Sequence, residues 1–549
     1  MKKRILCLLL SLLLLWPAMP VCSEGRTAPS LRVLLRRLGL TDHARITPEG
    51  ACLLEGKNGT ELLMKSGEAF TLRLRDGQIV LFHTAFTAPL GSSVTLTRKH
   101  SGGSAAAGLY IGSAGLYPGD LSLTISEDRL QPVLTLDMED YLCGVVPYEM
   151  SDSFPLEALK AQAVCARTYA LNRVSRDRSW DVVDTTNDQV FRGVSDANEN
   201  AARAVSETAG QVLTRGGKLV ECYYSASNGG QTEIPSHVWG TAPTAGKYEI
   251  RDDEWDRENP SSLTRSASLP KDGSVLYRRI ARLLREAVTR DDGWKKTGLS
   301  GDESTFRIDR ISAVAAKTPK YDAPSRLMTE LEVTLDVSGR KLNGGTLGPY
   351  ESAGSYTVTL NIFPDVLDAL GLAINGSGNE LLTVTEDEES FRLTTSRFGH
   401  GVGLSQRGAQ YMASEGEKTY KEILSFYFPE SALETYARQP SVLSTVNPLL
   451  ADPAPAATPA PSSAPAPTLM PVTEENLPAG AWIASVEGIS DGSTLNLRSA
   501  PSPIASIVMT LRKHQKLIVL DDLDVPGWAK VRTDTVEGYV MTSFLEKAP

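Results

Sequence analysis

Glu149 and two glycine-rich loops hold the residues of this sequence best suited to acid–base chemistry. Glu149 stands in the run Pro147-Tyr148-Glu149-Met150. Apolar neighbours can bury a carboxyl group and raise its pKa, so that it is protonated near neutral pH and can act as a general acid. The start of the helix expected after this run would favour the carboxylate instead, and the sequence leaves the balance open.

The two loops run from Tyr223 to Gly230 and from Arg397 to Ala409, and both are rich in Gly and in polar side chains. Glycine lets backbone amides approach a ligand closely, while Ser, Gln and His supply hydrogen bonds. We therefore predict one site built from the Glu149 segment and both loops.

Helical patterns follow Glu149 and are expected to position it. Ser151-Asp152-Ser153 reads as a cap and Pro155 as the first turn of a helix that continues to Val174, with small apolar residues on one face for packing against a sheet. A second helix is predicted around 197–210. A hairpin is predicted from 211–214 and 218–224, joined by Gly216-Gly217.

The remaining body is predicted to be rich in strands. From about residue 30 to 136, runs such as Leu72–Arg75 and Leu121–Ile125 alternate apolar and polar residues. In Thr241–Ser390, a basic amphipathic helix is predicted at 276–289 and strands at 331–337 and 356–362. This stretch has no motif for chemistry, and we expect it to complete the groove.

The composition and the ends of the chain bound its class. The 549 residues are 41% hydrophobic and carry a net charge of −10, which argues against a nucleic-acid-binding protein. Residues 1–23 read as a signal peptide or an uncleaved membrane anchor, with a basic start followed by an apolar run. The Pro/Ala-rich stretch 447–472 reads as a semi-rigid linker.

The cysteines are irregularly spaced, and no Cys/His cluster suggests a zinc site. If the first 23 residues are removed, Cys52, Cys143, Cys165 and Cys222 remain. Buried thiols and a disulfide are the alternatives for these four, with buried thiols preferred.

Residues 480–546 read as a small all-β module of short strands separated by turns. The runs Leu495–Ser502, Gly527–Val531 and Gly538–Val540 resemble the bacterial SH3 (SH3b) family. That resemblance implies a small barrel that grips cell-wall peptides or glycan. Trp528 and Tyr539 are the candidate wall-binding aromatics, with a place in the barrel core as the alternative.

Several separated motifs of the main body resemble the SpoIID/LytB family over about residues 30–432. The matching segments are 139–142, 145–150, 158–164, 167–170, 225–230, 238–240 and the loop around His400. The resemblance implies a peptidoglycan role. In the SpoIID branch the glutamate that matches Glu149 serves a lytic transglycosylase, whereas the other branch is named for enhancers of wall amidases. Some relatives hold zinc near the Ser/Gly loop, but here that region offers only His237, so no metal is expected.

The candidate substrate-binding residues are Tyr148, Lys160, Arg167, Tyr224, Ser225, Ser227, Gly229, Gly230, His400, Gly401, Ser405 and Gln406. For Lys160 and Arg167, internal ion pairs are the alternative. For His400, the alternative is a role in holding its loop through backbone hydrogen bonds. Glu139 and Asp140 are further carboxylates, with structural roles as the alternative.

The sequence therefore predicts an α+β, sheet-rich body with a few packed helices, a Pro-rich linker and an SH3-like barrel. The predicted function is an exported peptidoglycan lytic transglycosylase with Glu149 as its catalytic residue and no cofactor. A role in sporulation is one interpretation of this function. The alternative is a non-catalytic, wall-binding enhancer of an N-acetylmuramoyl-L-alanine amidase. The expected partners are glycan strands and, in the second case, an amidase. No nucleic-acid partner is expected, and a membrane contact only through an uncleaved N-terminal segment.

Overall fold

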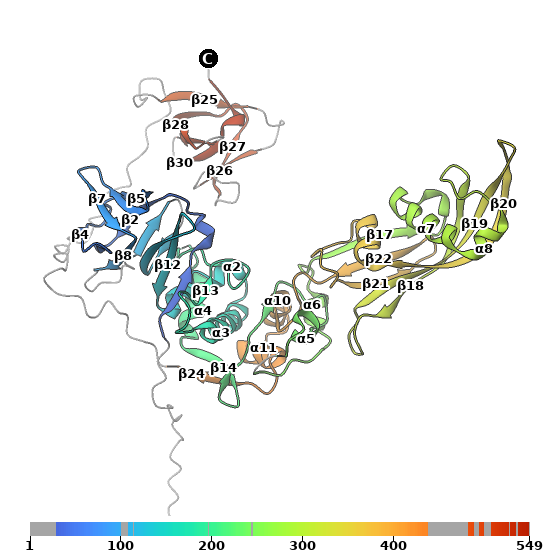
Figure 1. The fold of residues 1–549 in the computed structure, drawn as a ribbon, viewed down its shortest axis with the longest axis horizontal. Coiled ribbons are helices and arrows are strands. Elements are labelled where there is room, and N and C mark those ends of the chain that lie inside the picture. The colour runs from blue at the N-terminus through green and yellow to red at the C-terminus, as the bar shows by residue number, and fades with distance from the viewer. Residues whose placement is uncertain are drawn as a thin grey trace, which may run out of the picture. The chain divides into compact units, whose positions relative to one another are not determined.

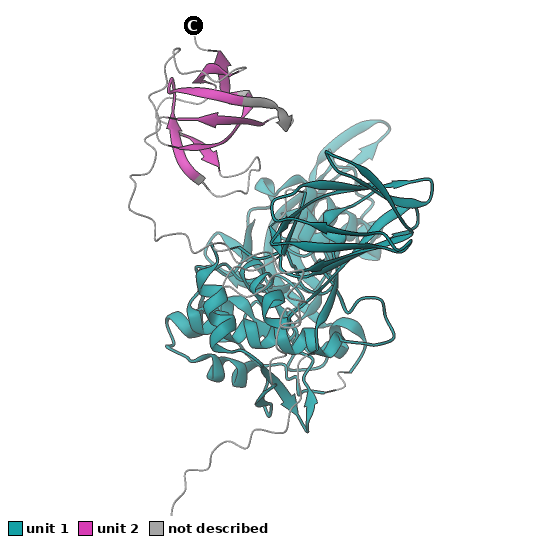
Figure 2. Cartoon of the chain, turned by 90° about the vertical axis from the view of Figure 1, so that its left-hand side faces the viewer, with its two compact units in different colours: residues 1–452 teal, residues 453–549 magenta. Residues whose placement is uncertain are grey.

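The chain forms two compact units, residues 1–452 and 453–549 (Figure 2). The structure is a computed structural model that describes residues 29–99, 108–112, 115–195, 197–242, 245–436, 481–487, 494–498, 507–525, 528–533 and 536–547. The predicted signal segment and the predicted linker lie outside these residues. Helices and strands mix within the first unit and the second is all β (Figure 1), so the predicted α+β class is confirmed.

Two sheets form the N-terminal part of the first unit. Their strand orders are β13-β1-β12-β11-β8-β3-β4 and β10-β9-β2-β5-β6-β7. The strands are β1 Leu31–Leu34, β2 His43–Glu49, β3 Cys52–Gly56, β4 Glu61–Met64, β5 Phe70–Arg75, β6 Gln78–Phe82, β7 Thr87–Gly91, β8 Ser93–Arg98, β9 Gly108–Ile111, β10 Leu116–Tyr117, β11 Asp120–Ser126, β12 Arg129–Leu136 and β13 Val182–Val183. The alternating runs at 72–75 and 121–125 lie in β5 and β11, as predicted.

The helical part of the first unit surrounds one central helix, α3. Its helices are α1 Met138–Cys143, α2 Val146–Glu149, α3 Leu156–Arg173, α4 Glu199–Glu207, α5 Pro235–Trp239, α6 Glu254–Glu258, α10 Gln406–Ser414 and α11 Tyr420–Tyr427. The strands beside them are β14 Gln211–Arg215, β15 Lys218–Leu219, β16 Tyr224–Ser225, β23 Leu404–Ser405 and β24 Ala432–Thr435. The hairpin of β14 and β15 turns at Gly216 and Gly217, both with positive φ, as predicted.

Two details of α3 differ from the sequence-based prediction. Helix α3 is buried on nearly every side, because α4, β14, α10 and α11 all pack against it, whereas a single buried face against a sheet was predicted. Asp152 does not cap α3. Its carboxylate accepts hydrogen bonds from the backbone amides of Asn200 and Ala201, at the start of α4.

Residues 264–396, called the insert lobe here, have a hydrophobic core of their own. The strands form two sheets, β17-β22-β21 and β18-β19-β20. The elements are β17 Thr264–Pro270, α7 Arg278–Arg290, α8 Asp292–Thr297, β18 Phe306–Pro319, β19 Met328–Asn343, β20 Thr346–Asn361, α9 Leu367–Leu370, β21 Leu381–Glu386 and β22 Ser390–Ser396. The predicted basic helix is α7, and the two predicted strands lie in β19 and β20.

The second unit contains one sheet, in the order β27-β26-β30-β29-β28-β25-β31, around a small core. Its strands are β25 Trp482–Val486, β26 Thr494–Arg498, β27 Ile507–Arg512, β28 Lys516–Val525, β29 Trp528–Arg532, β30 Glu537–Met541 and β31 Leu545–Lys547. Trp528 and Tyr539 are half-buried, and they alternate along β29 and β30 with the buried residues Ala529, Val531 and Val540. Both aromatics therefore lie outside the barrel core.

None of the helices in the described parts of the chain is long and apolar enough to cross a membrane.

Candidate functional site

A cavity of about 570 Å³ opens beside Glu149 in the first unit. Its walls come from α2, from the end of α3, from the segment after β13, from β16 and from the His400 loop. The lining residues are Glu149, Tyr169, Arg173, Thr186, Asn187, Asp188, Cys222, Tyr223, Tyr224, Ser225, Ala226, Trp239, Phe398, Gly399 and His400. The three segments predicted to share a site therefore meet at one cavity.

The Glu149 carboxyl has a raised pKa, and burial is the main cause. The backbone amide of Val190 donates a hydrogen bond to Glu149 Oε1 (3.0 Å), and the Gln406 side chain also hydrogen-bonds to the carboxyl. Both contacts favour the carboxylate, but burial outweighs them. Burial therefore favours the protonated form of Glu149 relative to a solvated glutamate.

Two short strands bring the predicted loops together. β16 pairs in parallel with β23, with Tyr224 opposite Leu404 and Ser225 opposite Ser405. Tyr224 is also tied to the helical core, since Gln189 Nε2 donates to its hydroxyl oxygen at 2.9 Å. This pairing fixes Tyr224 and Ser225 in the cavity wall and places Gln406, the first residue of α10, against Glu149.

Aromatic rings form another part of the wall. The ring centroid of Trp239 lies 4.6 Å from that of Tyr223 and 5.0 Å from that of His400. Trp239 is 43% exposed, so much of its ring remains open to a ligand. Exposed aromatic faces beside polar groups provide apolar contact area with defined geometry, which suits the C–H faces of a sugar.

His400 lines the cavity and also holds its own loop, which was the alternative role considered from the sequence. Its Nδ1 accepts a hydrogen bond from the backbone amide of Val402 (3.0 Å). Burial lowers the pKa of His400 to about 4, although a hydrogen bond to the backbone of Tyr224 favours the cation. His400 is therefore neutral near pH 7.

Two buried aspartates of the α6 region accept hydrogen bonds from the two loops and hold them in place. Asp256 accepts hydrogen bonds from the hydroxyls of Ser227 (2.8 Å) and Ser405. Asp253 accepts from the Asn228 amide (2.6 Å), and burial together with the nearby Asp256 charge raises the pKa of Asp253 to about 6. Ser227 and Ser405 are buried, and their hydroxyls point toward the Asp256 carboxylate. They therefore do not face the cavity and are not placed to touch substrate.

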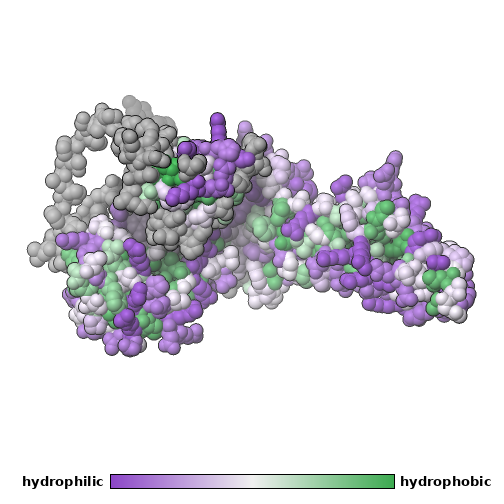
Figure 3. Space-filling view, turned by 90° about the horizontal axis from the view of Figure 1, so that it is seen from above, coloured by the Kyte–Doolittle hydropathy of each residue, from purple (hydrophilic) through white to green (hydrophobic). Residues whose placement is uncertain are grey.

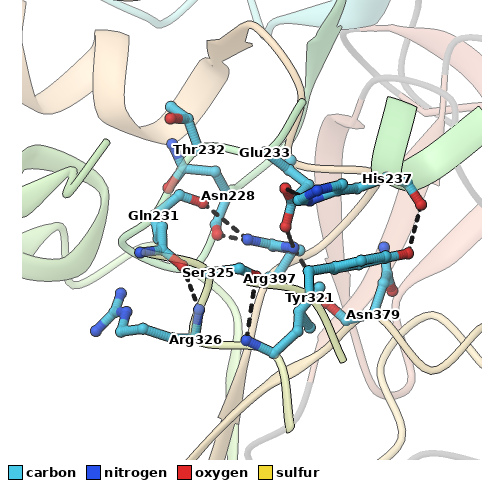
Figure 4. A network of polar contacts seen from close by, with 12 residues as sticks. Asn228, Gln231, Thr232, Glu233, His237, Tyr321, Ser325, Arg326, Asn379 and Arg397 are labelled. Carbon is cyan, nitrogen blue, oxygen red and sulfur yellow. Dashed lines mark hydrogen bonds and ion pairs between the residues drawn. The ribbon is translucent and has the colours of Figure 1, made fainter. Parts of the chain in front are cut away.

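A polar network behind the cavity joins the Ser/Gly loop to Arg397 (Figure 4). Arg397 is fully buried and donates from Nε to the Asn228 carbonyl (3.0 Å) and from Nη2 to the Gln231 carbonyl (2.9 Å). Its guanidinium lies 3.5 Å from Glu233, whose carboxylate also contacts His237 at 2.8 Å.

The insert lobe reaches this network through Tyr321. The Tyr321 ring stacks on His237 with ring centroids 3.8 Å apart, and its hydroxyl donates to the His237 carbonyl. No residue of the lobe lines the cavity itself. The sequence-based expectation that this region completes the groove is therefore wrong for the cavity wall. The lobe instead contacts, through Tyr321, the polar network that holds the loops.

Lys160 and Arg167 make the internal ion pairs that were the alternative to substrate contact. Arg167 is fully buried and forms a bidentate ion pair with Glu139, from Nε to Oε1 at 2.9 Å and from Nη2 to Oε2 at 2.5 Å. Lys160 pairs with Glu157 (2.7 Å) and Glu207 (2.6 Å). Neither cation lines the cavity, because each is held by carboxylates elsewhere in the helical core. Glu139 is likewise structural.

Five further residues singled out from the sequence do not line the cavity. Tyr148 is exposed beside Arg192, whose guanidinium lies 5.1 Å from the Tyr148 ring. Gly401 donates its amide to Ser225 Oγ. Gly229 and Gly230 have positive φ, and a Cβ at either would meet neighbouring atoms at 2.6 and 2.9 Å, so they serve close packing. Asp140 also lies outside the cavity wall.

Several cavity residues were missed from the sequence, chiefly Arg173, Asp188 and Trp239. Tyr169 donates its hydroxyl to Asp188 Oδ1 (2.9 Å), and the other oxygen of Asp188 accepts from the Val183 amide (2.9 Å). Arg173 lies with its guanidinium 4.7 Å from the Tyr169 ring. The helical spacing of Tyr169 and Arg173 after the Arg167 motif was the available signal, and the 186–188 segment carries no motif.

Cysteines and metal ligands add no second centre in the described part of the chain. No group of three or more His, Cys, Asp or Glu side chains converges there to hold a metal. Cys52, Cys143, Cys165 and Cys222 are free thiols in this structure, and burial raises the pKa of Cys165, which contacts Cys222. A protonated, buried thiol is a poor nucleophile.

The fold and the site together define a two-unit protein whose larger unit carries the partly buried Glu149 carboxyl in an aromatic-walled cavity, and whose smaller unit contains one β-sheet. Residues 126–215 match the family described as Stage II sporulation protein, and residues 493–546 match the bacterial SH3 domain. Two segments of the chain therefore match, in this order, a SpoIID family model and a bacterial SH3 domain model, as the sequence motifs predicted.

Three similar proteins carry two different names. The chain is 31% identical over 309 residues to the amidase enhancer of Bacillus subtilis (strain 168), covering 54% of this chain but only 40% of that protein. It is 27% identical over 326 residues to the stage II sporulation protein D of Bacillus amyloliquefaciens (56% of this chain, 77% of that protein). For stage II sporulation protein D of Bacillus subtilis (strain 168), the identity is 25% over 334 residues, covering 58% and 80%.

Proposed function

We propose that this protein is an extracytoplasmic lytic transglycosylase that cleaves the glycan strands of peptidoglycan, with Glu149 as its catalytic acid and base. The observation that carries the proposal is the Glu149 carboxyl, which lies in the cavity wall with a pKa raised by burial. The SpoIID match and the relatives named stage II sporulation protein D agree with it.

One carboxyl suffices for this reaction. Protonated Glu149 donates its proton to the glycosidic oxygen as the bond to the anomeric carbon breaks. The C6 hydroxyl of the same sugar then attacks that carbon and gives its proton to the Glu149 carboxylate. The product is a 1,6-anhydromuramic end, no water is consumed, and the acid is regenerated. A hydrolase would need a second carboxylate as base or nucleophile.

The cavity offers one other carboxylate, Asp188, but its oxygens are engaged by Tyr169 and by the Val183 amide. We assign Asp188 to positioning Tyr169. Substrate contacts are assigned to Tyr224, Ser225, Trp239 and His400, which share the wall with Glu149. Wall attachment is assigned to the SH3 unit, where Trp528 and Tyr539 lie outside the core.

The test is release of anhydromuramic fragments from glycan strands by purified protein. Glu149→Gln preserves the shape of the side chain but cannot donate the proton, and is expected to reduce the rate by about 10²- to 10⁴-fold. The matched control is Glu199→Gln, an exposed glutamate in the first turn of α4, which should cleave like the wild type. Equal activity of Glu149→Gln and the control would refute the assignment.

A second candidate function is enhancement of a wall amidase, which the relative named amidase enhancer favours. In that case the purified chain would leave glycan intact, and an added N-acetylmuramoyl-L-alanine amidase would release peptide faster in its presence. The Glu149→Gln variant separates the two functions, because an enhancer does not need a proton donor in the cavity and would stimulate the amidase unchanged.

A further inference from the structure

The insert lobe carries a basic surface that the proposed cleavage does not use. Helix α7 contains five arginines, at positions 278, 279, 282, 285 and 290, and a single acidic residue, Glu286. The whole chain has a net charge of −10. This helix therefore concentrates positive charge in an otherwise acidic protein.

The apolar side of α7 is occupied. Ile280, Leu284 and Val288 are buried in the core of the lobe. Four of the five arginines lie on the solvent side, and Arg278 is 87% and Arg290 is 79% exposed. The fifth, Arg285, is partly buried and donates to the Gly301 carbonyl at 3.1 Å. Figure 3 shows hydrophilic side chains over much of the lobe, at the right of the view. A basic amphipathic helix whose apolar side is already packed has no apolar side left to insert into a bilayer.

Few carboxylates balance these charges. Glu286 serves both Arg282 and Arg290, at the long distances of 3.8 and 3.7 Å, and Arg278 contacts the exposed Glu303 at 3.2 Å. Such exposed pairs contribute little. Arg279 makes no ion pair among the described residues.

A cavity of about 610 Å³ lies where α7 begins. Arg278 and Arg279 meet Arg392 of β22 there, with Tyr277 and the Ser266 and Ser268 hydroxyls of β17 nearby. Asp368 is the one carboxylate in the wall. Three arginines from two separate elements thus line one hollow, in addition to the arginines further along the helix.

We propose that this surface, centred on Arg279 and Arg392 and continued along α7, binds the phosphodiester groups of an anionic polymer. Guanidinium forks bind phosphate oxygens in pairs, with charge-assisted hydrogen bonds. The first and last arginines of α7, Arg278 and Arg290, are 12 residue steps apart, which is about 18 Å of helix. A row of arginines of that length can contact several successive phosphate groups of a polymer. It is longer than a single phosphate ion. The lobe then holds the protein to a phosphate-bearing wall polymer.

The test measures binding of the full chain to fluorescent poly(glycerol phosphate) at fixed ionic strength. Arg279→Gln combined with Arg392→Gln is expected to weaken binding about tenfold or more, through the loss of two charge-assisted contacts. The matched control, Arg45→Gln with Arg129→Gln, removes two exposed arginines from the N-terminal sheets and changes the net charge equally. It is expected to bind within about twofold of the wild type.

Circular dichroism checks that both double variants keep the wild-type fold, as exposed substitutions should. Equal weakening in the two variants would overturn the proposal, because it would show an effect of net charge alone. Two competitors complete the test. Poly-glutamate that competes as well as the phosphate polymer, or vesicles of phosphatidylglycerol and phosphatidylcholine that bind more tightly than the polymer, would also overturn it.

Discussion

Removing the Arg167 guanidinium tests whether this side chain is structural, as its burial indicates. Arg167→Met keeps a similar length but deletes two contacts to Glu139 and a third to the Gln211 carbonyl, at 3.1 Å. Glu139 would remain largely buried, with only the Gly210 amide as a described donor to its Oε1. Removing one member of a buried ion pair typically costs about 3–5 kcal/mol, so we expect the free energy of unfolding to fall by that amount.

Two comparisons sharpen this prediction. Adding Glu139→Gln to Arg167→Met removes the uncompensated charge and should restore part of the lost stability. Lys160→Met, on the same helix, breaks pairs whose carboxylate partners are 32% and 42% exposed, and should cost about 1 kcal/mol or less.

Urea unfolding followed by far-ultraviolet circular dichroism measures all three variants. The reasoning is refuted if Arg167→Met unfolds at the wild-type urea concentration yet no longer binds glycan. That outcome would mean that Arg167 contacts substrate, as one of the two sequence-based alternatives predicted.

Three further predictions concern the cavity. Glu149 must be protonated to act as the acid, so the cleavage rate should decline as pH rises through its raised pKa. Gln406→Leu removes a hydrogen bond that favours the carboxylate, so the Glu149 pKa should rise further. The decline in a pH–rate profile should therefore move to higher pH. His400 has a pKa near 4 in the folded protein against about 6.5 when unfolded, so its stabilising contribution is complete above pH 6.5 and is lost as pH falls toward 4. His400→Gln should lack this contribution, so the stability difference between wild type and variant should change between pH 6.5 and 4 in urea unfolding at several pH values. Trp239→Ala should weaken binding of glycan fragments about tenfold by isothermal calorimetry, with unchanged stability.

Local patterns predicted the elements well, because they depend on neighbouring residues. The Ala- and Leu-rich run after Pro155 predicted α3, and Gly216-Gly217 predicted the hairpin turn. The same patterns could not show that α3 is surrounded on nearly all sides, since its small residues satisfy close packing in any direction.

The site was harder to predict, because side-chain direction in its loops is set by distant partners. Ser227 and Ser405 turn away from the cavity because buried Asp256, on α6, accepts both hydroxyls. Asp188 enters the wall without any motif, through the course of the chain after β13, whereas Arg173 enters it from the last turn of α3. Glu149 and His400 were found because each belongs to a recognisable local run.

The most direct measurement is mass spectrometry of glycan digested by the wild-type chain in ¹⁸O-labelled water. If Glu149 uses the C6 hydroxyl of the sugar as nucleophile, the new ends are anhydromuramic, carry no ¹⁸O, and disappear with Glu149→Gln. Reducing ends with one ¹⁸O per cleavage would mean that water is the nucleophile, and would contradict the mechanism.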